Sequence, residues 1–190
     1  WEMDAKSVIT NPSPQAPLLH KKGQTVLTGV AWSGRGTITR VDVSIDGGKN
    51  WRKVLGDGLG NTEEDDQYTG VSEVFMDPRD PDVMYAVAWQ RLRNVEVVIN
   101  GGPGTGIHKS VDGGETWREL TNGLPEGMMG KTGLAISPQD PDVIYAIIEA
   151  QRDEGGVFRS TDRGETWTKQ SDYVSGSPQY YNELIPDPVD

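Results

Sequence analysis

Three aspartates recur in one local pattern, and a carboxylate is a natural candidate for acid–base catalysis or metal binding. The pattern is Ser-x-Asp-x-Gly-x-x-Trp, and it occurs at Ser44–Trp51, Ser110–Trp117 and Ser160–Trp167. A calcium loop needs oxygen donors at alternating positions. Because Gly47-Gly48 and Gly113-Gly114 leave too few such donors, the pattern disfavours a calcium site.

The same residue types are typical of a self-contained turn. An aspartate two residues into a hairpin accepts hydrogen bonds from backbone N–H groups of its own turn, and glycine tolerates positive φ. The tryptophan restarts the next strand, where its ring can anchor a core. Three copies on separate repeats would occupy one peripheral position each and would not converge on one catalytic centre. We therefore predict no catalytic and no metal-binding residue here, and interpret the following residues as structural: Ser44, Asp46, Gly48, Trp51, Ser110, Asp112, Gly114, Trp117, Ser160, Asp162, Gly164 and Trp167.

Four other features could carry chemistry, and each favours a simpler interpretation. His20 and His108 lie in different segments without a dense carboxylate set, so we expect surface residues. The segment Gly101–Gly106 lacks the Lys-Ser/Thr of a phosphate loop and precedes a strand, which indicates a hairpin insertion. The acidic run Glu63–Asp66 indicates a solvated loop, with weak cation binding as the alternative. The segment Arg91–Arg93 is the main basic spot and could form a rim contact.

The elements that position these residues form repeats. Val74–Ala86 and Leu134–Ala146 align without a gap. The segments are short, β-branched and bounded by Gly, Pro or Asp, which predicts strands and almost no helix. Four strands per unit of about 50 to 60 residues are typical of a propeller blade. The predicted strands are residues 26–32, 38–44, 70–76, 82–90, 106–110, 116–120, 142–148 and 156–160.

Composition excludes several classes of function. The formal net charge of -11 repels phosphate backbones and anionic membranes, so neither nucleic acid nor membrane insertion is expected. The absence of cysteine removes disulfides, thiolate metal sites and cysteine nucleophiles. No run approaches the roughly 18 apolar residues of a membrane helix. Residues 1–6 do not resemble a signal peptide, which favours a mature or excised piece. We expect no cofactor.

From about residue 53 to residue 190, the repeated turns and the Asp-Pro-x-Asp-Pro-Asp-Val-x-Tyr motif resemble the Asp-box (BNR) β-propellers of the sortilin-like and "glycosyl hydrolase-like" group. The resemblance implies a secreted or periplasmic propeller whose Asp-boxes are structural. Sialidases of this kind use an arginine cluster, a Tyr/Glu pair and an Asp, but no such set maps onto the arginines present: Arg91, Arg93, Arg118, Arg152, Arg159 and Arg163.

Residues 1 to about 52 resemble a different family. Met3–Thr10, Gly29–Gly36 and Ile38–Ser44 are similar to the first half of the immunoglobulin-like dimerisation domain that ends sulfite oxidases and sulfite dehydrogenases of the molybdenum-cofactor family. That domain also carries a Ser-x-Asp-Gly-Gly-x-x-Trp turn, so the two resemblances meet at Ser44–Trp51. The chain therefore resembles a fusion across this turn. The metal-ligating cysteine of that family is absent, which removes the basis for carrying over its reaction.

These observations predict an all-β chain: a partial immunoglobulin-like sheet in residues 1–52, joined to about two and a half β-propeller blades with Asp-box turns in residues 53–190. We interpret it as a non-catalytic scaffold or interaction module in an extracytoplasmic compartment. Its expected partners are copies of itself or another β-rich subunit, joined through terminal blades, and a glycan is a further candidate. The alternatives are a carbohydrate-active propeller fragment and an accessory part of a sulfite-oxidising molybdoenzyme.

Overall fold

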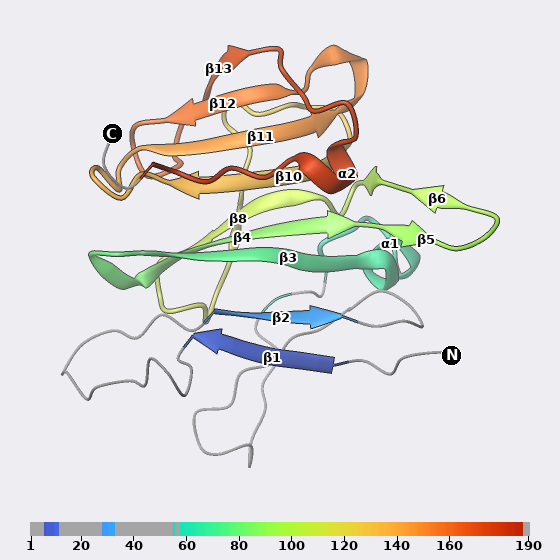
Figure 1. The fold of residues 1–190 in the computed structure, drawn as a ribbon, viewed down its shortest axis with the longest axis horizontal. Coiled ribbons are helices and arrows are strands. Elements are labelled where there is room, and N and C mark those ends of the chain that lie inside the picture. Colours follow the sequence, from blue (N-terminus) through green and yellow to red (C-terminus); the bar gives the residue numbers. More distant parts are fainter. Residues whose placement is uncertain (1–5, 12–27, 33–54, 56–57, 188–190) are drawn as a thin grey trace.

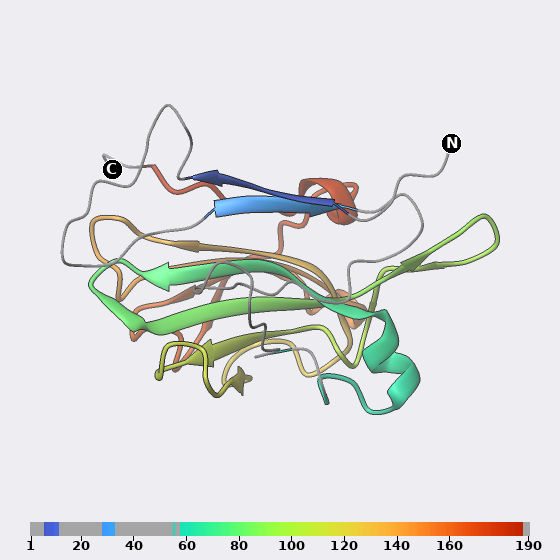
Figure 2. The same cartoon turned by 90° about the horizontal axis from the view of Figure 1, so that it is seen from below.

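The computed structural model describes residues 6–11, 28–32, 55 and 58–187, and these are mostly strands. Two sheets of four and five strands pack face to face, as Figures 1 and 2 show. The predicted all-β class is therefore confirmed. The strands are β1 (Lys6–Asn11), β2 (Thr28–Trp32), β3 (Thr69–Asp77), β4 (Asp80–Gln90), β5 (Leu92–Arg93), β6 (Val98–Ile99), β7 (Gly101–Gly102), β8 (Gly106–Ser110), β9 (Arg118–Leu120), β10 (Met129–Ile136), β11 (Ile144–Ala150), β12 (Gly156–Ser160) and β13 (Thr168–Ser171).

The first sheet has the order β3-β4-β8-β9 and is antiparallel throughout. The second sheet repeats this meander as β10-β11-β12-β13 and adds β7 beside β10. The four strands predicted for residues 70–120 are all present, with ends shifted by one or two residues. Strand β2 was predicted, and it pairs with β1, which was not predicted as a strand. The strand predicted at residues 38–44 lies outside the described residues.

Within the described ranges, helix is confined to short segments: α1 (Glu63–Tyr68), α2 (Pro178–Tyr181) and the 3-10 turn η1 (Gln151–Asp153). The prediction of a loop at Glu63–Asp66 is wrong, because these residues begin α1. Thr62 caps this helix: its Oγ1 accepts the Asp65 N–H at 3.1 Å and donates to the Asp65 carboxylate at 2.9 Å. A short polar helix carries too little apolar periodicity to be recognised from sequence.

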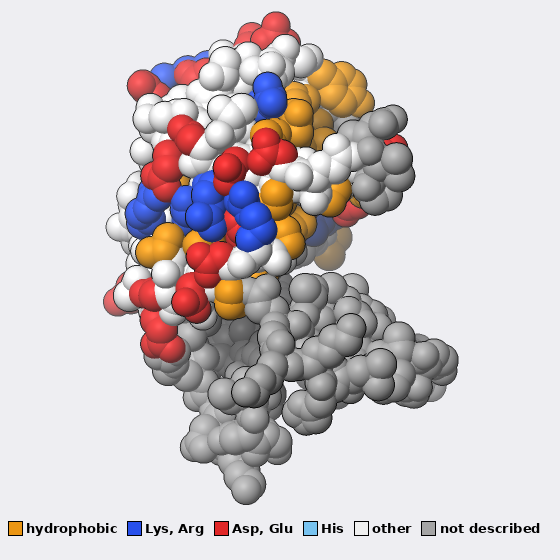
Figure 3. Space-filling model, turned by 90° about the vertical axis from the view of Figure 1, so that its left-hand side faces the viewer, with side chains coloured by type: hydrophobic (Ala, Val, Ile, Leu, Met, Phe, Trp, Pro, Cys, Tyr) orange, Lys and Arg blue, Asp and Glu red, His pale blue; other side chains and the backbone are white. Residues whose placement is uncertain are grey.

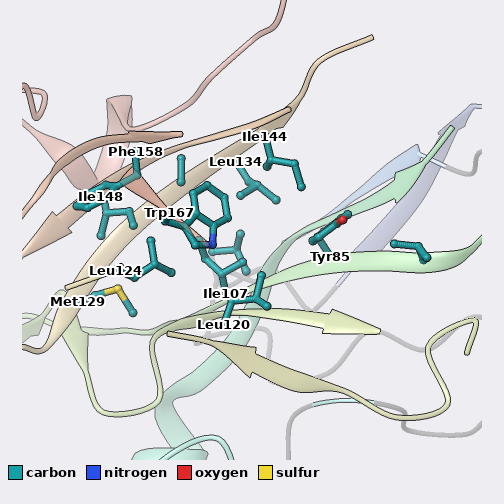
Figure 4. Close-up of a cluster of buried hydrophobic side chains, with 13 residues drawn as sticks. Tyr85, Ile107, Leu120, Leu124, Met129, Leu134, Ile144, Ile148, Phe158 and Trp167 are labelled. Carbon is teal, nitrogen blue, oxygen red and sulfur yellow. The ribbon is translucent and has the colours of Figure 1, made fainter. Parts of the chain in front are cut away.

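The core lies between the two sheets (Figure 4). Alternate residues of each strand point to this face, so Tyr85 and Val87 of the first sheet meet Leu134 and Ile144 of the second. Trp167 closes the cluster at 5% exposure. Trp117, its counterpart in the first sheet, is only half-buried. The predicted role of the motif tryptophan as a core anchor therefore holds for Trp167.

Two further contacts hold β10 against the first sheet. Strand β7 leaves the first sheet's meander and pairs with Met129 and Gly130 at the start of β10. Further along β10, Glu73 of β3 connects the two sheets. Its carboxylate accepts the Leu134 N–H at 3.1 Å and forms an ion pair with Lys131 Nζ at 2.7 Å. The Gly101–Gly106 insertion thus supplies an inter-sheet strand and not only a hairpin.

Replacing Glu73 should destabilise the protein strongly. Glu73→Ala leaves the Lys131 ammonium, whose side chain is 9% exposed, and the Leu134 N–H without their acceptor, and breaking one side of a buried ion pair typically costs about 3–5 kcal/mol. Glu73→Gln retains an oxygen for Leu134 and should lose less. Urea unfolding measures both, and equal stability of Glu73→Ala and the wild type would contradict this account of the joint.

Candidate functional site

Both described turns of the repeated motif have the same internal hydrogen bonds. In the first, Asp112 accepts the Thr116 N–H at 2.9 Å and the Thr116 hydroxyl at 2.6 Å, while Ser110 Oγ accepts the Gly114 N–H at 2.8 Å. The Trp117 indole N–H donates to the Gly114 carbonyl at 3.0 Å. The second turn reproduces these contacts with Ser160, Asp162, Gly164, Thr166 and Trp167. Ser44, Asp46, Gly48 and Trp51 lie outside the described residues.

The hydrogen bonds hold both aspartates in the charged form. Donation by the Thr116 hydroxyl and N–H lowers the pKa of Asp112 to about 2. Burial opposes the shift at Asp162, but the Thr166 and Ser160 donors still lower its pKa to about 2. A carboxylate with this pKa carries no proton near neutral pH, so neither group can act as a general acid there.

Each turn also docks on the repeated Asp-Pro-Asp-Val segment of its own sheet. The Gly113 N–H donates to the Asp82 carbonyl at 2.9 Å, and the Arg163 N–H donates to the Asp142 carbonyl at 3.0 Å. Gly113 and Arg163 both have positive φ, 70° and 60°. The two repeated motifs in the sequence are therefore the two halves of one contact, which explains why they occur together.

The second turn makes further contacts with the first sheet, at a cluster that we call the inter-sheet joint. The Arg163 carbonyl accepts hydrogen bonds from the Tyr85 hydroxyl at 3.0 Å and from Lys109 Nζ at 2.7 Å. Lys109 also pairs with Glu165 at 2.6 Å. Burial raises the pKa of Tyr85 to about 12, and donation by Lys109 lowers the pKa of Glu165. The phenol therefore remains a donor and the carboxylate an acceptor.

The Arg163 side chain completes the joint. Its guanidinium reaches Asp77 of the first sheet at 2.9 Å, beside Arg79, which bridges Asp77 at 3.0 Å and Asp142 at 2.6 Å. Asp77 is fully buried, and although burial raises its pKa, the bonds from Arg79 and the charge of Arg163 bring that pKa below its ordinary value. Figure 3 shows this end of the molecule, where arginine and lysine side chains gather among acidic ones.

The repeat places a second tyrosine–cation pair, equivalent to Tyr85 and Lys109, on the outer face of the second sheet. Tyr85 pairs directly with Lys109 across β4 and β8, and Tyr145 pairs directly with Arg159 across β11 and β12. The cation lies over the ring in both pairs, at 5.6 Å and 5.9 Å from the centroid. Tyr85 is fully buried, whereas Tyr145 is 36% exposed. These pairs were not predicted from the sequence, although Tyr85 and Tyr145 align in the repeat and a basic residue precedes both Ser110 and Ser160.

The opposite end of the strands carries aromatic and basic side chains. Arg91 lies over the Trp89 ring at 4.8 Å, and Arg93 contacts the Tyr180 hydroxyl and lies 5.9 Å from its ring. Tyr180 and Tyr181 are 50% and 71% exposed. The hairpin β5–β6 projects from this end (Figure 2). A rim contact through Arg91–Arg93 stays a prediction.

The remaining candidate residues from the sequence are the two histidines, His20 and His108. The prediction that His108 lies at the surface is wrong: it is 7% exposed on β8, and burial lowers its pKa to about 4. His20 lies outside the described residues. Among residues 58–187, no three His, Asp or Glu side chains gather as a metal site would require. No described helix has the length and apolar character needed to cross a membrane.

Comparison with known proteins gives two separate likenesses. A family model of the Mo-co oxidoreductase dimerisation domain matches residues 1–98, and a BNR/Asp-box repeat model matches residues 158–169. The chain is 41% identical over 59 residues to sulfite oxidase of Gallus gallus, which covers 30% of this chain and 12% of that protein. Both parts of the suspected fusion are thus represented.

The second likeness is to xyloglucanases. The chain is 32% identical over 121 residues to xyloglucanase Xgh74A of Acetivibrio thermocellus, covering 60% of this chain and 13% of that protein. The solved GH74 xyloglucanase from Xanthomonas campestris superposes with a TM-score of 0.54 at 22% identity, over 80% of this chain and 22% of that one. The structural match shows the propeller-type fold. The chain spans only about an eighth of the length of the relatives it matches.

Asp162→Ala should destabilise the protein in a pH-dependent way. Removing the carboxylate takes away the acceptor of the Thr166 N–H and hydroxyl, and because Thr166 is exposed and water can replace this acceptor, the expected cost is about 1 kcal/mol. Because the folded pKa of about 2 lies below the ordinary 3.8, the carboxylate stabilises the fold above pH 3.8, and this stabilisation disappears as the pH falls to 2. The difference in unfolding free energy between wild type and variant should therefore shrink over that range.

Chemical denaturation at several pH values measures this difference. Glu126→Ala removes an exposed carboxylate elsewhere and serves as the control. A difference that does not depend on pH would contradict this account.

Proposed function

Because the chain belongs, over residues 1–98, to the family of the Mo-co oxidoreductase dimerisation domain, we propose that it is a non-catalytic β-rich interaction module that associates with copies of itself. The observation that carries the proposal is the outer face of β11 and β12. This face repeats the Tyr–cation pair of the inter-sheet joint, and Tyr145 and Arg159 on it are exposed.

The edges of the sheets support a contact through this face and not through strand pairing. The outer edge strands β9 and β13 have three and four residues, with the sequences Arg-Glu-Leu and Thr-Lys-Gln-Ser. Short, charged edge strands are the usual means by which sheets avoid pairing with other chains. We therefore propose that the terminal blades associate through this face and not through their outer edge strands.

The domain division at residues 52 and 53 remains a proposal. The family match to residue 98 extends into the first sheet, which begins at Thr69. The extracytoplasmic location is likewise proposed from the propeller resemblance, and the mouse sulfite oxidase relative carries a mitochondrial name. An accessory role in a sulfite-oxidising molybdoenzyme stays a hypothesis that rests on the sulfite oxidase likeness alone.

Glycan binding is the second candidate function. It is favoured by the exposed rings of Tyr180 and Tyr181 beside Arg93, since an aromatic ring presents an apolar face with a polar rim suited to a sugar. The relatives named xyloglucanases point to xyloglucan as the polysaccharide to test. Binding at this end of the strands would leave the outer face of β11 and β12 free for association.

Self-association should appear as a mass that rises with concentration. Light scattering coupled to size exclusion, from micromolar to hundreds of micromolar chain, is expected to give masses above the monomer for the wild type. Tyr145→Asp places a charge on the outer face and should lower the mass. Tyr173→Asp is the matched control, because Tyr173 is 63% exposed. A wild type that stays monomeric throughout would refute the proposed function.

Glycan binding predicts retardation of the protein in a native gel containing xyloglucan. The double variant Tyr180→Ala/Tyr181→Ala should lose the retardation because both exposed rings are removed, whereas Tyr173→Ala should keep it. If the wild type migrates identically with and without xyloglucan, the second candidate function is wrong. The first candidate is unaffected by that result.

A further inference from the structure

The segment that follows α2 repeats the first strand of each sheet. Residues 182–187 align with residues 132–137 at the spacing that separates the last two Asp-box turns. They lie on the outer face of the second sheet: the Asn182 amide donates to the Lys131 carbonyl at 2.9 Å, and a Cβ at Gly133 would meet the Asn182 carbonyl at 2.5 Å. Figure 1 shows this segment running along the second sheet. It therefore takes the place of the first strand of a third unit.

This segment has no strand beside it, unlike its two counterparts. Strand β3 pairs with β4, and β10 pairs with β11 in the same register. None of the described strands pairs with residues 183–186, which we call the acceptor segment. The Ile185 N–H and carbonyl have no hydrogen-bond partner within the described part of the chain, and the Ile185 side chain is 91% exposed. The acceptor segment is therefore an unpaired, partly apolar edge.

The repeat indicates where a strand would pair with this edge. The Leu134 N–H donates to Glu73 and so points away from β11. Because successive residues of a strand point their backbone groups to opposite edges, Ala135 faces β11. Ile185 aligns with Ala135, so its N–H and carbonyl face the equivalent position. That position lies over β11, on the outer face where Tyr145 is exposed.

The hairpin β5–β6 is a second unpaired element, and we call residues 92–99 the finger. It has no counterpart in the second repeat, where residues 151–155 join β11 to β12. Asn94 orders its turn, because its side-chain oxygen accepts the N–H groups of Glu96 and Val97, both at 2.8 Å. Figure 1 shows the finger projecting away from the two packed sheets. An ordered insertion that projects in this way is suited to contact another molecule.

The outer edge of β6 can accept a strand. The Asn94 N–H donates to the Val97 carbonyl at 3.0 Å, so the next pair along the hairpin, Arg93 with Val98, is of the non-hydrogen-bonded type. The Val98 N–H and carbonyl therefore face away from β5. Val97 and Val98 are 44% and 58% exposed. An apolar edge of this kind lacks the charges that protect β9 and β13 and favours pairing with another strand.

We propose that β6 in the finger of one copy pairs antiparallel with the acceptor segment of a second copy, with Val98 opposite Ile185. This inference rests on the proposed self-association and names the strands that form it. Backbone hydrogen bonds provide the affinity in such strand addition, and the added strand covers the outer face over β11. Because the two surfaces differ, the contact is head-to-tail and association is open-ended.

The finger must come from a second copy. Arg93, at the base of the finger, contacts the Tyr180 hydroxyl of α2. From α2 the acceptor segment runs in one direction along the second sheet and the finger projects in the other (Figure 1). Within one chain the two edges therefore point apart.

Charge permits this contact in an acidic chain. Arg93 and Glu96 are the charged residues of the finger and cancel each other, so a locally neutral strand approaches Glu183 of the acceptor segment. The net charge of -11 opposes association at long range. At physiological ionic strength the Debye length is about 8 Å, so this repulsion between distant charges is screened.

The decisive experiment removes one outward N–H from each edge in the full chain. Proline has no N–H and is tolerated on edge strands where this group faces outward, so Val98→Pro and Ile185→Pro should leave the internal hydrogen bonds intact. Each alone should weaken association at least about fivefold, the scale of one lost hydrogen bond. An equimolar mixture retains one intact contact, between the finger of the Ile185→Pro variant and the acceptor segment of the Val98→Pro variant. It should form one-to-one heterodimers and nothing larger.

Two conservative variants serve as controls. Val98→Thr and Ile185→Val keep the N–H and a β-branched side chain, so both should associate like the wild type. Thermal unfolding of every variant verifies that the fold is retained. Hydrogen exchange of the wild type gives a readout without mutation: the amides of Val98 and Ile185 should exchange more slowly at high chain concentration than at low concentration.

The outcomes separate this inference from the proposed function. If the wild type associates and both proline variants associate equally well, strand addition is wrong and self-association stands. The same conclusion follows if the mixture forms no heterodimers, or if exchange at Val98 and Ile185 does not depend on concentration while the mass does. A wild type that is monomeric at every concentration would overturn both proposals.

Discussion

The packing of the two sheets depends on one backbone carbonyl, that of Arg163. The positive φ of this residue turns the carbonyl toward the first sheet, where Tyr85 and Lys109 donate to it. A non-glycine residue in this conformation is strained. Here the side chain offsets the strain, because the guanidinium that glycine would lack reaches buried Asp77. This joint and the Glu73 contacts connect the two sheets whose facing sides form the core in Figure 4.

The two repeats form sheets with the same strand order, but equivalent positions in the two sheets have different neighbours. Gly133 and Ala135 align in the repeat with Glu73 and Phe75. The side chains at these positions therefore differ in size, and so do the segments that can pack against them. Glu73 reaches across to β10, whereas Gly133 admits the segment that follows α2. Tyr145 keeps the residue type of Tyr85 but not its burial. Similar sequence in neighbouring repeats therefore serves one joint inside the molecule and, in our proposal, a second joint between molecules.

Local patterns predicted the strands and the turns well, for a physical reason. The hydrogen bonds of Asp112 and Asp162 are made within five residues, and the strand ends follow Gly, Pro and Asp, so both are encoded locally. Predictions from the sequence were wrong where the burial of a side chain depends on packing between distant parts of the chain. His108 was expected at the surface, but its burial is a property of packing on β8 and cannot be inferred from neighbouring residues.

The sequence by itself determined the all-β class, the two repeats and the self-contained turns, because each depends on residues close together in the chain. Only the tertiary structure showed that the Arg163 carbonyl meets Tyr85 and Lys109, and that Tyr145 and Arg159 repeat this pair on an exposed face. Donor and acceptor in the joint are separated by 54 to 78 positions in sequence. Contacts over such separations arise when sheets pack, since apolar faces bring together side chains whose spacing along the chain carries no local signal.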